Sequence, residues 1–93
     1  MNARVLVVDD EGEMAETIAD YLDSRGYRAE TAVGGKAALQ LLKRKEFDAV
    51  ISDLRMDAVD GLDVLAAARA ADPGRPVIIM TAYGTIDLSL IHI

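Results

Sequence analysis

The chain has 93 residues, 52% of them hydrophobic and 28% charged, which is enough for one small domain and excludes a kinase or a two-domain dehydrogenase. It has no Cys and one His, which excludes disulfides, thiolate chemistry and the usual zinc sites. The net charge of −6 disfavours direct binding to nucleic acid, and no apolar run is long enough to span a membrane, so we expect a cytoplasmic protein.

The first third of the sequence alternates apolar runs with amphipathic stretches. The β-branched run at 4–8 predicts a strand buried on both faces, and it ends at Asp9 and Asp10. Apolar residues that recur every four positions predict a helix over 13–24. Alternation over 27–33 predicts a strand at the edge of a sheet. Two acids therefore follow the first strand directly.

The rest of the sequence repeats this alternation of helices and strands. Two further strands end in polar residues, namely Asp53 and Thr81. The expected elements, in chain order, are a helix around 38–45, a strand at 47–53, a helix over 61–71 and a strand at 77–80.

Alternation of short apolar strands with helices predicts an α/β fold, a doubly wound parallel sheet with helices on both faces. In such sheets ligands bind beyond the carboxyl ends of the strands, where the strand order reverses. The residues at these ends are Asp9, Asp10, Asp53 and Thr81. We therefore expect the chemistry of the protein at these four positions.

The three acids predict a site for a divalent cation and a phosphoryl group. If the first and third strands are neighbours, Asp9, Asp10 and Asp53 share one small pocket, where their charges repel unless a hard cation such as Mg²⁺ intervenes. Asp53 stands alone at its strand end and is the better phosphoryl acceptor, with the Thr81 hydroxyl able to come alongside. Each acid taken singly is more typical of a helix cap or a turn.

Four segments, in this order, resemble the receiver domain of bacterial two-component response regulators, in particular the nitrogen-regulator type. The resemblance implies a flavodoxin-like (CheY-like) sheet of strand order 2-1-3-4-5. The segments are V-L-V-V-D-D-E at 5–11, I-S-D-L-R-M at 51–56, D-G-L at 60–62 and P-V-I-I-M-T-A-Y-G at 76–84.

The resemblance also implies roles for individual residues. Asp53 would accept a phosphoryl group from a sensor histidine kinase. Asp10 would bind Mg²⁺ directly, Asp9 largely through water, and the backbone carbonyl of Arg55 would complete the protein ligands. Thr81 would be the switch hydroxyl. Such a domain is a phosphoacceptor switch with self-phosphotransfer chemistry only, and not an enzyme in the ordinary sense.

The family implies partners as well. Receivers of this type usually precede an ATPase that activates transcription and a DNA-binding domain, and they commonly dimerise when activated. We therefore expect a transcriptional output domain and a homodimer in the full-length protein, with no direct contact between this domain and nucleic acid.

The sequence departs from the family pattern in a loop and at its end. Asp57 stands where the family usually has Pro, and no residue can be assigned the essential Lys of the family's fifth strand. We expect a partial receiver over 1–87 with strand order 2-1-3-4, lacking the fifth strand and the last helices, so that strand 77–80 is an exposed edge. Residues 88–93, L-S-L-I-H-I, resemble the translation of a transposon-end adapter used in DNA library preparation, and we interpret them as a non-native tail.

Two other functions stay open on the sequence. The missing Lys and Asp57 favour a pseudo-receiver that acts through protein contacts without being phosphorylated. An aspartate-nucleophile phosphatase of the haloacid-dehalogenase type is a third hypothesis, but that family has D-x-D after its first strand, and D-D-E at 9–11 fits this pattern poorly.

Overall fold

Four parallel strands form the centre of the fold, in the order predicted from the sequence. The structure is a computed structural model that describes residues 3–53, 56, 60–81 and 84–87. Within them, one sheet has the strand order β2-β1-β3-β4-β5. The strands are β1 (Arg4–Asp9), β2 (Arg28–Val33), β3 (Ala49–Asp53), β4 (Val77–Thr81) and β5 (Gly84–Asp87).

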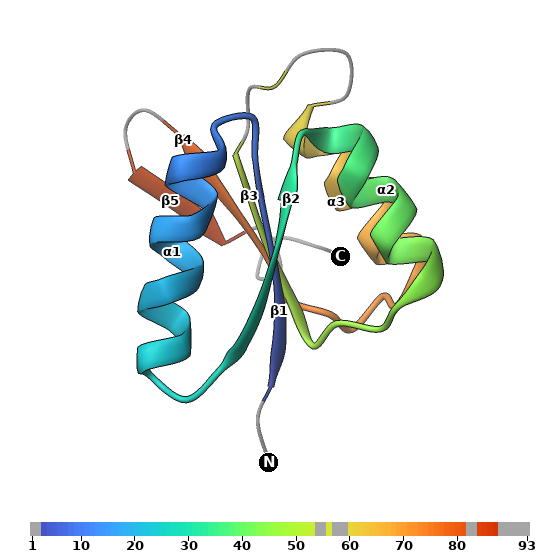
Figure 1. The fold of residues 1–93 in the computed structure, drawn as a ribbon. Coiled ribbons are helices and arrows are strands. Elements are labelled where there is room, and N and C mark those ends of the chain that lie inside the picture. Colours follow the sequence, from blue (N-terminus) through green and yellow to red (C-terminus); the bar gives the residue numbers. More distant parts are fainter. Residues whose placement is uncertain (1–2, 54–55, 57–59, 82–83, 88–93) are drawn as a thin grey trace.

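Helices cover both faces of the sheet, as predicted. Helix α1 (Gly12–Ser24) lies on one face, and α2 (Gly35–Arg44) and α3 (Gly61–Ala71) lie side by side on the other (Figure 1). Each helix follows a parallel strand and returns the chain to the start of the next one, which is the arrangement of a doubly wound α/β fold.

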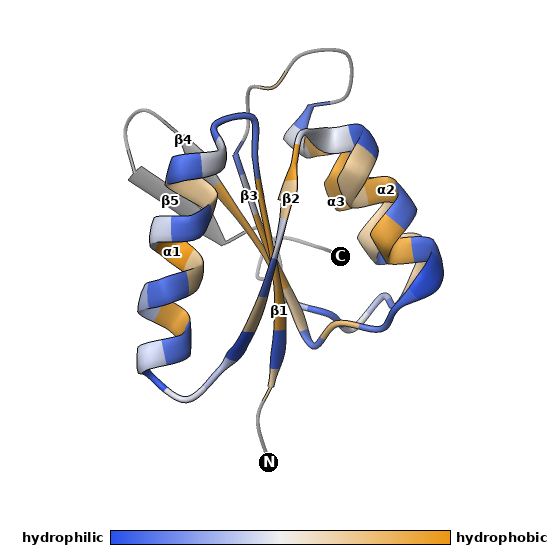
Figure 2. Cartoon of the chain, in the orientation of Figure 1, coloured by the Kyte–Doolittle hydropathy of each residue, from blue (hydrophilic) through white to orange (hydrophobic). Residues whose placement is uncertain are grey.

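Strand β1 is the centre of the hydrophobic core because both of its faces are covered. Val5 and Val7 pack on the α1 side with Ala15 and Ala19 of that helix. The alternate residues of the strand, Leu6 among them, pack on the other side against α2 and α3. The helices accordingly turn their apolar sides toward the sheet and their polar sides outward (Figure 2). The prediction of a strand buried on both faces is confirmed.

The third strand begins later than the sequence predicted, at Ala49 instead of residue 47. Phe47 is buried in the core although it precedes the strand, and the guanidinium of Arg4 lies 5.7 Å from the centre of its ring. The backbone N–H of Asp48 donates to the carbonyl of Arg4 at 2.7 Å. The side chain of Phe47 thus belongs to the core although the residue lies in the loop before β3. Its hydrophobic character is the reason that the sequence predicted it as part of the strand.

The prediction that β4 forms an exposed edge is wrong. Strand β5 runs antiparallel along β4, with Ile78 opposite Asp87 and Thr81 opposite Gly84. This hairpin pairs backbone N–H and C=O groups that would otherwise lack partners at the sheet edge. The fifth strand of this sheet is therefore an antiparallel return of the chain, which the sequence analysis did not predict. Residues 88–93, interpreted as a non-native tail, lie outside the described residues.

None of the helices in the described ranges has both the length and the apolar character that crossing a lipid bilayer requires.

The core packing predicts a large difference between two identical substitutions. Leu6 is fully buried, whereas Leu62, in the first turn of α3, is 52% exposed. Leu6→Ala should lower the free energy of unfolding by about 2–5 kcal/mol, because it leaves a cavity in the core. Leu62→Ala should change it by no more than about 0.5 kcal/mol. Urea unfolding followed by circular dichroism measures both, and equal losses would contradict this description of the core.

Candidate functional site

Two of the predicted site residues end neighbouring strands. Strands β1 and β3 are paired in parallel, with Val8 opposite Ser52. The next residue of each strand is its last, Asp9 in β1 and Asp53 in β3. Because adjacent strands lie about 4.8 Å apart, the two acids leave the sheet side by side. The condition set from the sequence, that the first and third strands are neighbours, is confirmed.

Asp9 is almost completely buried, with 6% of its surface exposed. Its carboxylate accepts a hydrogen bond from the backbone N–H of Glu11 at 2.9 Å, and its backbone carbonyl accepts one from Gly34 at 3.0 Å. The first bond shapes the turn into α1, and the second joins the ends of β1 and β2. Asp9 is therefore held by its own turn, and it has the structural role that strand-end aspartates commonly have.

Asp10 is half-buried in the turn between β1 and α1 and lies beside Gly34. A Cβ atom added to Gly34 would lie 3.5 Å from Oδ1 of Asp10. Gly34 has φ 91° and ψ 157°, a backbone conformation that is essentially restricted to glycine. The sequence pattern did not reveal that this glycine lies beside the acid. Its position directly after a strand, at the carboxyl edge of the sheet, was the available signal.

Asp53 is half-buried at the end of β3. The buried Ser52 before it donates a hydrogen bond from Oγ to the Asp53 backbone carbonyl at 3.0 Å. In the β3–β4 pair Asp53 lies opposite Met80, so Thr81 is one residue further along β4. The side chain of Thr81, and all of Arg55 and Asp57, lie outside what the structure describes.

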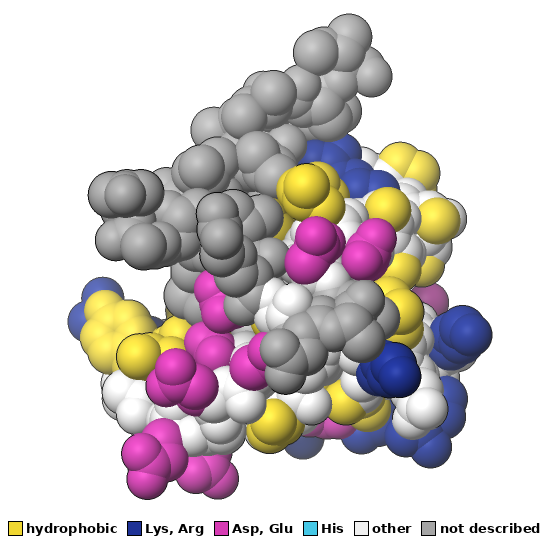
Figure 3. Space-filling model, turned by 90° about the horizontal axis from the view of Figure 1, so that it is seen from above, with side chains coloured by type: hydrophobic (Ala, Val, Ile, Leu, Met, Phe, Trp, Pro, Cys, Tyr) yellow, Lys and Arg dark blue, Asp and Glu magenta, His cyan; other side chains and the backbone are white. Residues whose placement is uncertain are grey.

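Acidic side chains gather on this end of the molecule, which Figure 3 views from above. Two of them have a structural explanation at the start of α3. Asp60 caps the helix by accepting hydrogen bonds from the backbone N–H groups of Leu62 and Asp63, at 2.9 and 3.1 Å. Asp63 completes the capping box by accepting from the N–H of Asp60. Asp9, Asp10 and Asp53 are the acids at the strand ends proper.

The donor atoms at these strand ends suit a hard cation. Across the described ranges no three His, Cys, Asp or Glu side chains are arranged to hold a metal ion together. Mg²⁺ does not require such a group, because it takes one or two carboxylates and keeps several waters. Carboxylates at 9, 10 and 53 offer only oxygen, which is the donor type that Mg²⁺ prefers. The roles assigned to these residues stay predictions.

The sequence pattern of the response regulator receiver domain matches residues 5–91. The chain belongs to this family. This receiver domain is 44% identical over 84 residues to the transcriptional regulatory protein GlrR of Escherichia coli (strain K12), a match that covers 90% of this chain and 19% of that protein. The chain therefore spans about a fifth of the length of the curated relatives it matches. The resemblance to nitrogen-regulator-type receivers is confirmed.

Solved structures confirm the receiver fold. The response regulator TrrA from Thermotoga maritima, in complex with Mg(2+)-BeF, is 36% identical with a TM-score of 0.81, over 89% of this chain and 71% of that one. A response regulator from Burkholderia pseudomallei, with a phosphorylated aspartic acid, a calcium ion and citrate, is 29% identical with a TM-score of 0.81, over 89% of this chain and 49% of that one. The predicted flavodoxin-like class is thereby established for this receiver.

Two glycines provide a test of the backbone beside Asp10. Gly34 and Gly26 both have positive φ, 91° and 95°, but a Cβ on Gly26 would meet nothing within 4 Å. Gly34→Ala should lower the free energy of unfolding by about 1–3 kcal/mol because of backbone strain. Gly26→Ala, the control without a neighbouring side chain, should also destabilise the chain, since alanine rarely adopts that φ. Chemical denaturation measures both, and an unchanged stability of Gly34→Ala would contradict the described turn.

Proposed function

We propose that this domain is the phosphoacceptor of a two-component response regulator and that Asp53 takes a phosphoryl group from a sensor histidine kinase. The register of β1 and β3 carries the proposal, because it ends both strands in an acid at the same edge of the sheet. Membership of the receiver family supports it, and so does the half-buried position of Asp53 at the end of β3.

The proposed reaction is an in-line transfer of a phosphoryl group from a histidine nitrogen to a carboxylate oxygen. A carboxylate oxygen of Asp53 attacks the phosphorus of a phosphohistidine, the new O–P bond forms as the N–P bond breaks, and the electron pair returns to the imidazole nitrogen. The product is an acyl phosphate on Asp53. Such transfers need positioning and charge neutralisation more than covalent help from the protein.

We assign the cation site to Asp9, Asp10 and Asp53 with the backbone carbonyl of Arg55. When bound, Mg²⁺ would neutralise the charge on the phosphoryl oxygens and on these carboxylates. Asp9 would act through the carboxylate that the Glu11 N–H orients at 2.9 Å. The proposed switch is the Thr81 hydroxyl, which would donate a hydrogen bond to the new phosphate.

In the proposed signalling chain this domain controls other parts of a longer protein. The relatives are transcriptional regulators of which this domain covers about a fifth, which supports a transcriptional output domain, an activator ATPase followed by a DNA-binding module. A cytoplasmic location and activation-linked dimerisation of the full-length protein belong to the same proposal.

Among the acids, only Asp53 should carry the phosphoryl label. Incubation with an acyl phosphate and Mg²⁺ should label the chain, and Asp53→Asn should abolish the label because the amide is not a nucleophile. Mass spectrometry and the acid-stable, base-labile character of the label identify the acyl phosphate. Asp20→Asn is the matched control, since Asp20 is exposed on α1, and it should be labelled as fully as the unsubstituted chain.

Other labelling patterns would replace this proposal. Label on Asp9 with continuous turnover would identify a phosphatase, and the absence of label would identify a pseudo-receiver. A chain extended by the remaining receiver elements, including their Lys, should be measured in parallel. No label in either chain would overturn the proposed function.

Cation binding should depend on Asp10. Asp10→Asn should weaken Mg²⁺ binding at least tenfold, about 1.4 kcal/mol, because a direct carboxylate ligand loses its charge. Titration with MgCl₂ followed by amide NMR signals of residues 9–12 measures the affinity, and Asp20→Asn again serves as control. Equal affinities for the Asp10 variant and the unsubstituted chain would remove Asp10 from the site.

A further inference from the structure

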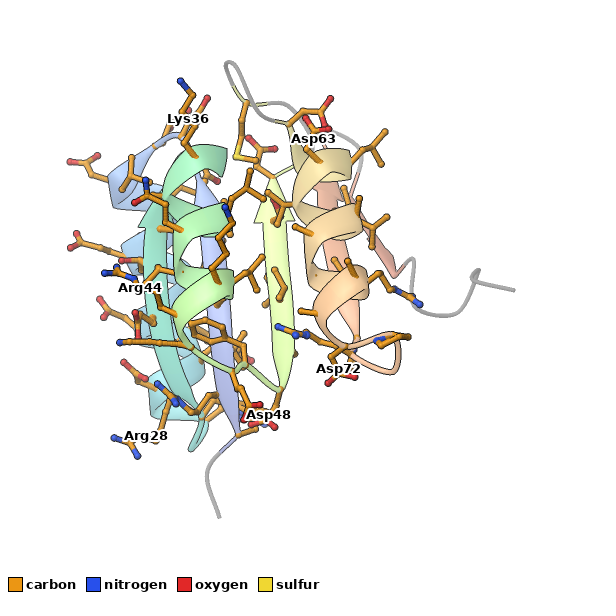
Figure 4. All side chains as sticks on the ribbon, turned by 90° about the vertical axis from the view of Figure 1, so that its right-hand side faces the viewer. Arg28, Lys36, Arg44, Asp48, Asp63 and Asp72 are labelled. Carbon is orange, nitrogen blue, oxygen red and sulfur yellow. The ribbon has the colours of Figure 1, made fainter. Side chains whose placement is uncertain are left out.

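A cavity lies at the opposite end of the sheet from the acids at the strand ends. Its volume is about 440 Å³, within the usual range of small-molecule sites. The C-terminal ends of α2 and α3 and the segments that lead into β3 and β4 form its walls. In Figure 4, Asp48 and Asp72 lie toward this end, and Lys36 and Asp63 lie at the other. Nothing in the proposed phosphotransfer uses this cavity.

The unusual feature of this cavity is a buried arginine. Arg75 lines the wall and is only 5% exposed. Its Nε and Nη1 atoms are buried and have no hydrogen-bond partner. No ion pair in the described part of the chain includes it. A buried guanidinium without a hydrogen-bond partner lowers the stability of the fold. This side chain therefore either only destabilises the protein or binds an anion that offsets the cost.

The nearby carboxylates are engaged elsewhere. Asp48 accepts a hydrogen bond from the backbone N–H of Arg4 at 2.8 Å, and Asp72 accepts one from the N–H of Gly74 at 3.2 Å. Among the cations of the cavity, Lys45 forms an ion pair with Glu30 at 3.0 Å. Three carboxylates line the cavity, Glu46 being the third, and in the described residues none of them forms a hydrogen bond or an ion pair with the Arg75 side chain.

Two exposed cations add to the charge of Arg75. Lys43 and Arg44 line the same cavity, and no side chain in the described residues forms an ion pair with either. The lining has four basic and three acidic side chains, and the basic groups without an ion-pair partner among the described residues suit the oxygens of a phosphate monoester. The cavity is larger than a phosphate group, and Leu42, Phe47 and Ala71 supply an apolar part of its lining.

We propose that this cavity binds a small phosphorylated organic molecule, with the phosphate toward Arg75 and the organic part against the apolar residues. A turn of the arginine side chain toward the ligand gives its unpartnered N–H groups an acceptor. The site is separate from Asp53, so it is independent of the proposed phosphotransfer.

The test uses phenyl phosphate, with inorganic phosphate and phenol as comparison probes. Titration of the ¹⁵N-labelled chain, without divalent cations, should shift the amide signals of residues 43–48 and 71–75 and the Nε–H signal of Arg75. Phenyl phosphate should bind at least tenfold more tightly than inorganic phosphate, and phenol should not shift these signals. Arg75→Met should weaken binding at least tenfold. Arg28→Met, which removes an exposed arginine that does not line the cavity, should leave it unchanged.

Two further variants keep the test decisive. Asp53→Asn should bind phenyl phosphate as tightly as the unsubstituted chain, because the two sites are separate. Lys43→Met/Arg44→Met changes only exposed residues and should weaken binding at least threefold, which tests the cavity even if Arg75→Met fails to fold. Absence of saturable shifts, equal affinity in the Arg75 variant and in Arg28→Met, or loss of binding in Asp53→Asn would overturn the proposal.

Discussion

The pairing of β1 with β3 is the constraint on which the site depends. A parallel pair brings the same ends of two strands to one edge, and Val8 opposite Ser52 fixes which residues end together. A shift of one residue would turn the side chains of β1 to the wrong faces, and its two buried faces forbid that. The hydrophobic core therefore sets the positions of Asp9 and Asp53, although neither acid contributes apolar contact.

The strand-end acids and the basic residues of the cavity lie at opposite ends of the sheet. Acids follow the carboxyl ends of β1 and β3, while Lys43 and Arg44 occupy the last turn of α2 near the other end. Basic groups in a last turn interact favourably with the helix dipole, so their position has a structural basis. Arg75 has no such explanation, because its guanidinium is buried and its Nε and Nη1 atoms have no hydrogen-bond partner. The two proposed sites, for a cation with a phosphoryl group and for an organic phosphate, therefore lie at opposite ends of the sheet.

Strand β5 supplies hydrogen-bond partners for the backbone groups at the edge of β4. The sequence analysis predicted no strand here, yet Gly84–Asp87 pairs with β4. The apolar run of β4 has its backbone hydrogen bonds completed by the nearest available segment, which is its own continuation. This is a tertiary outcome that the composition of residues 84–87 did not signal.

The alternation of apolar runs and amphipathic stretches determined the fold class, the helices α1 and α3 and the candidate acids, because these depend on local periodicity and on which residues follow each strand. The sequence could not place Phe47 outside β3, since a buried loop residue has the same hydrophobicity as a buried strand residue. Only the tertiary structure placed Gly34 beside Asp10 and left Arg75 buried without a partner. Both arrangements depend on contacts between segments that are distant in the sequence, and packing between elements decides such contacts.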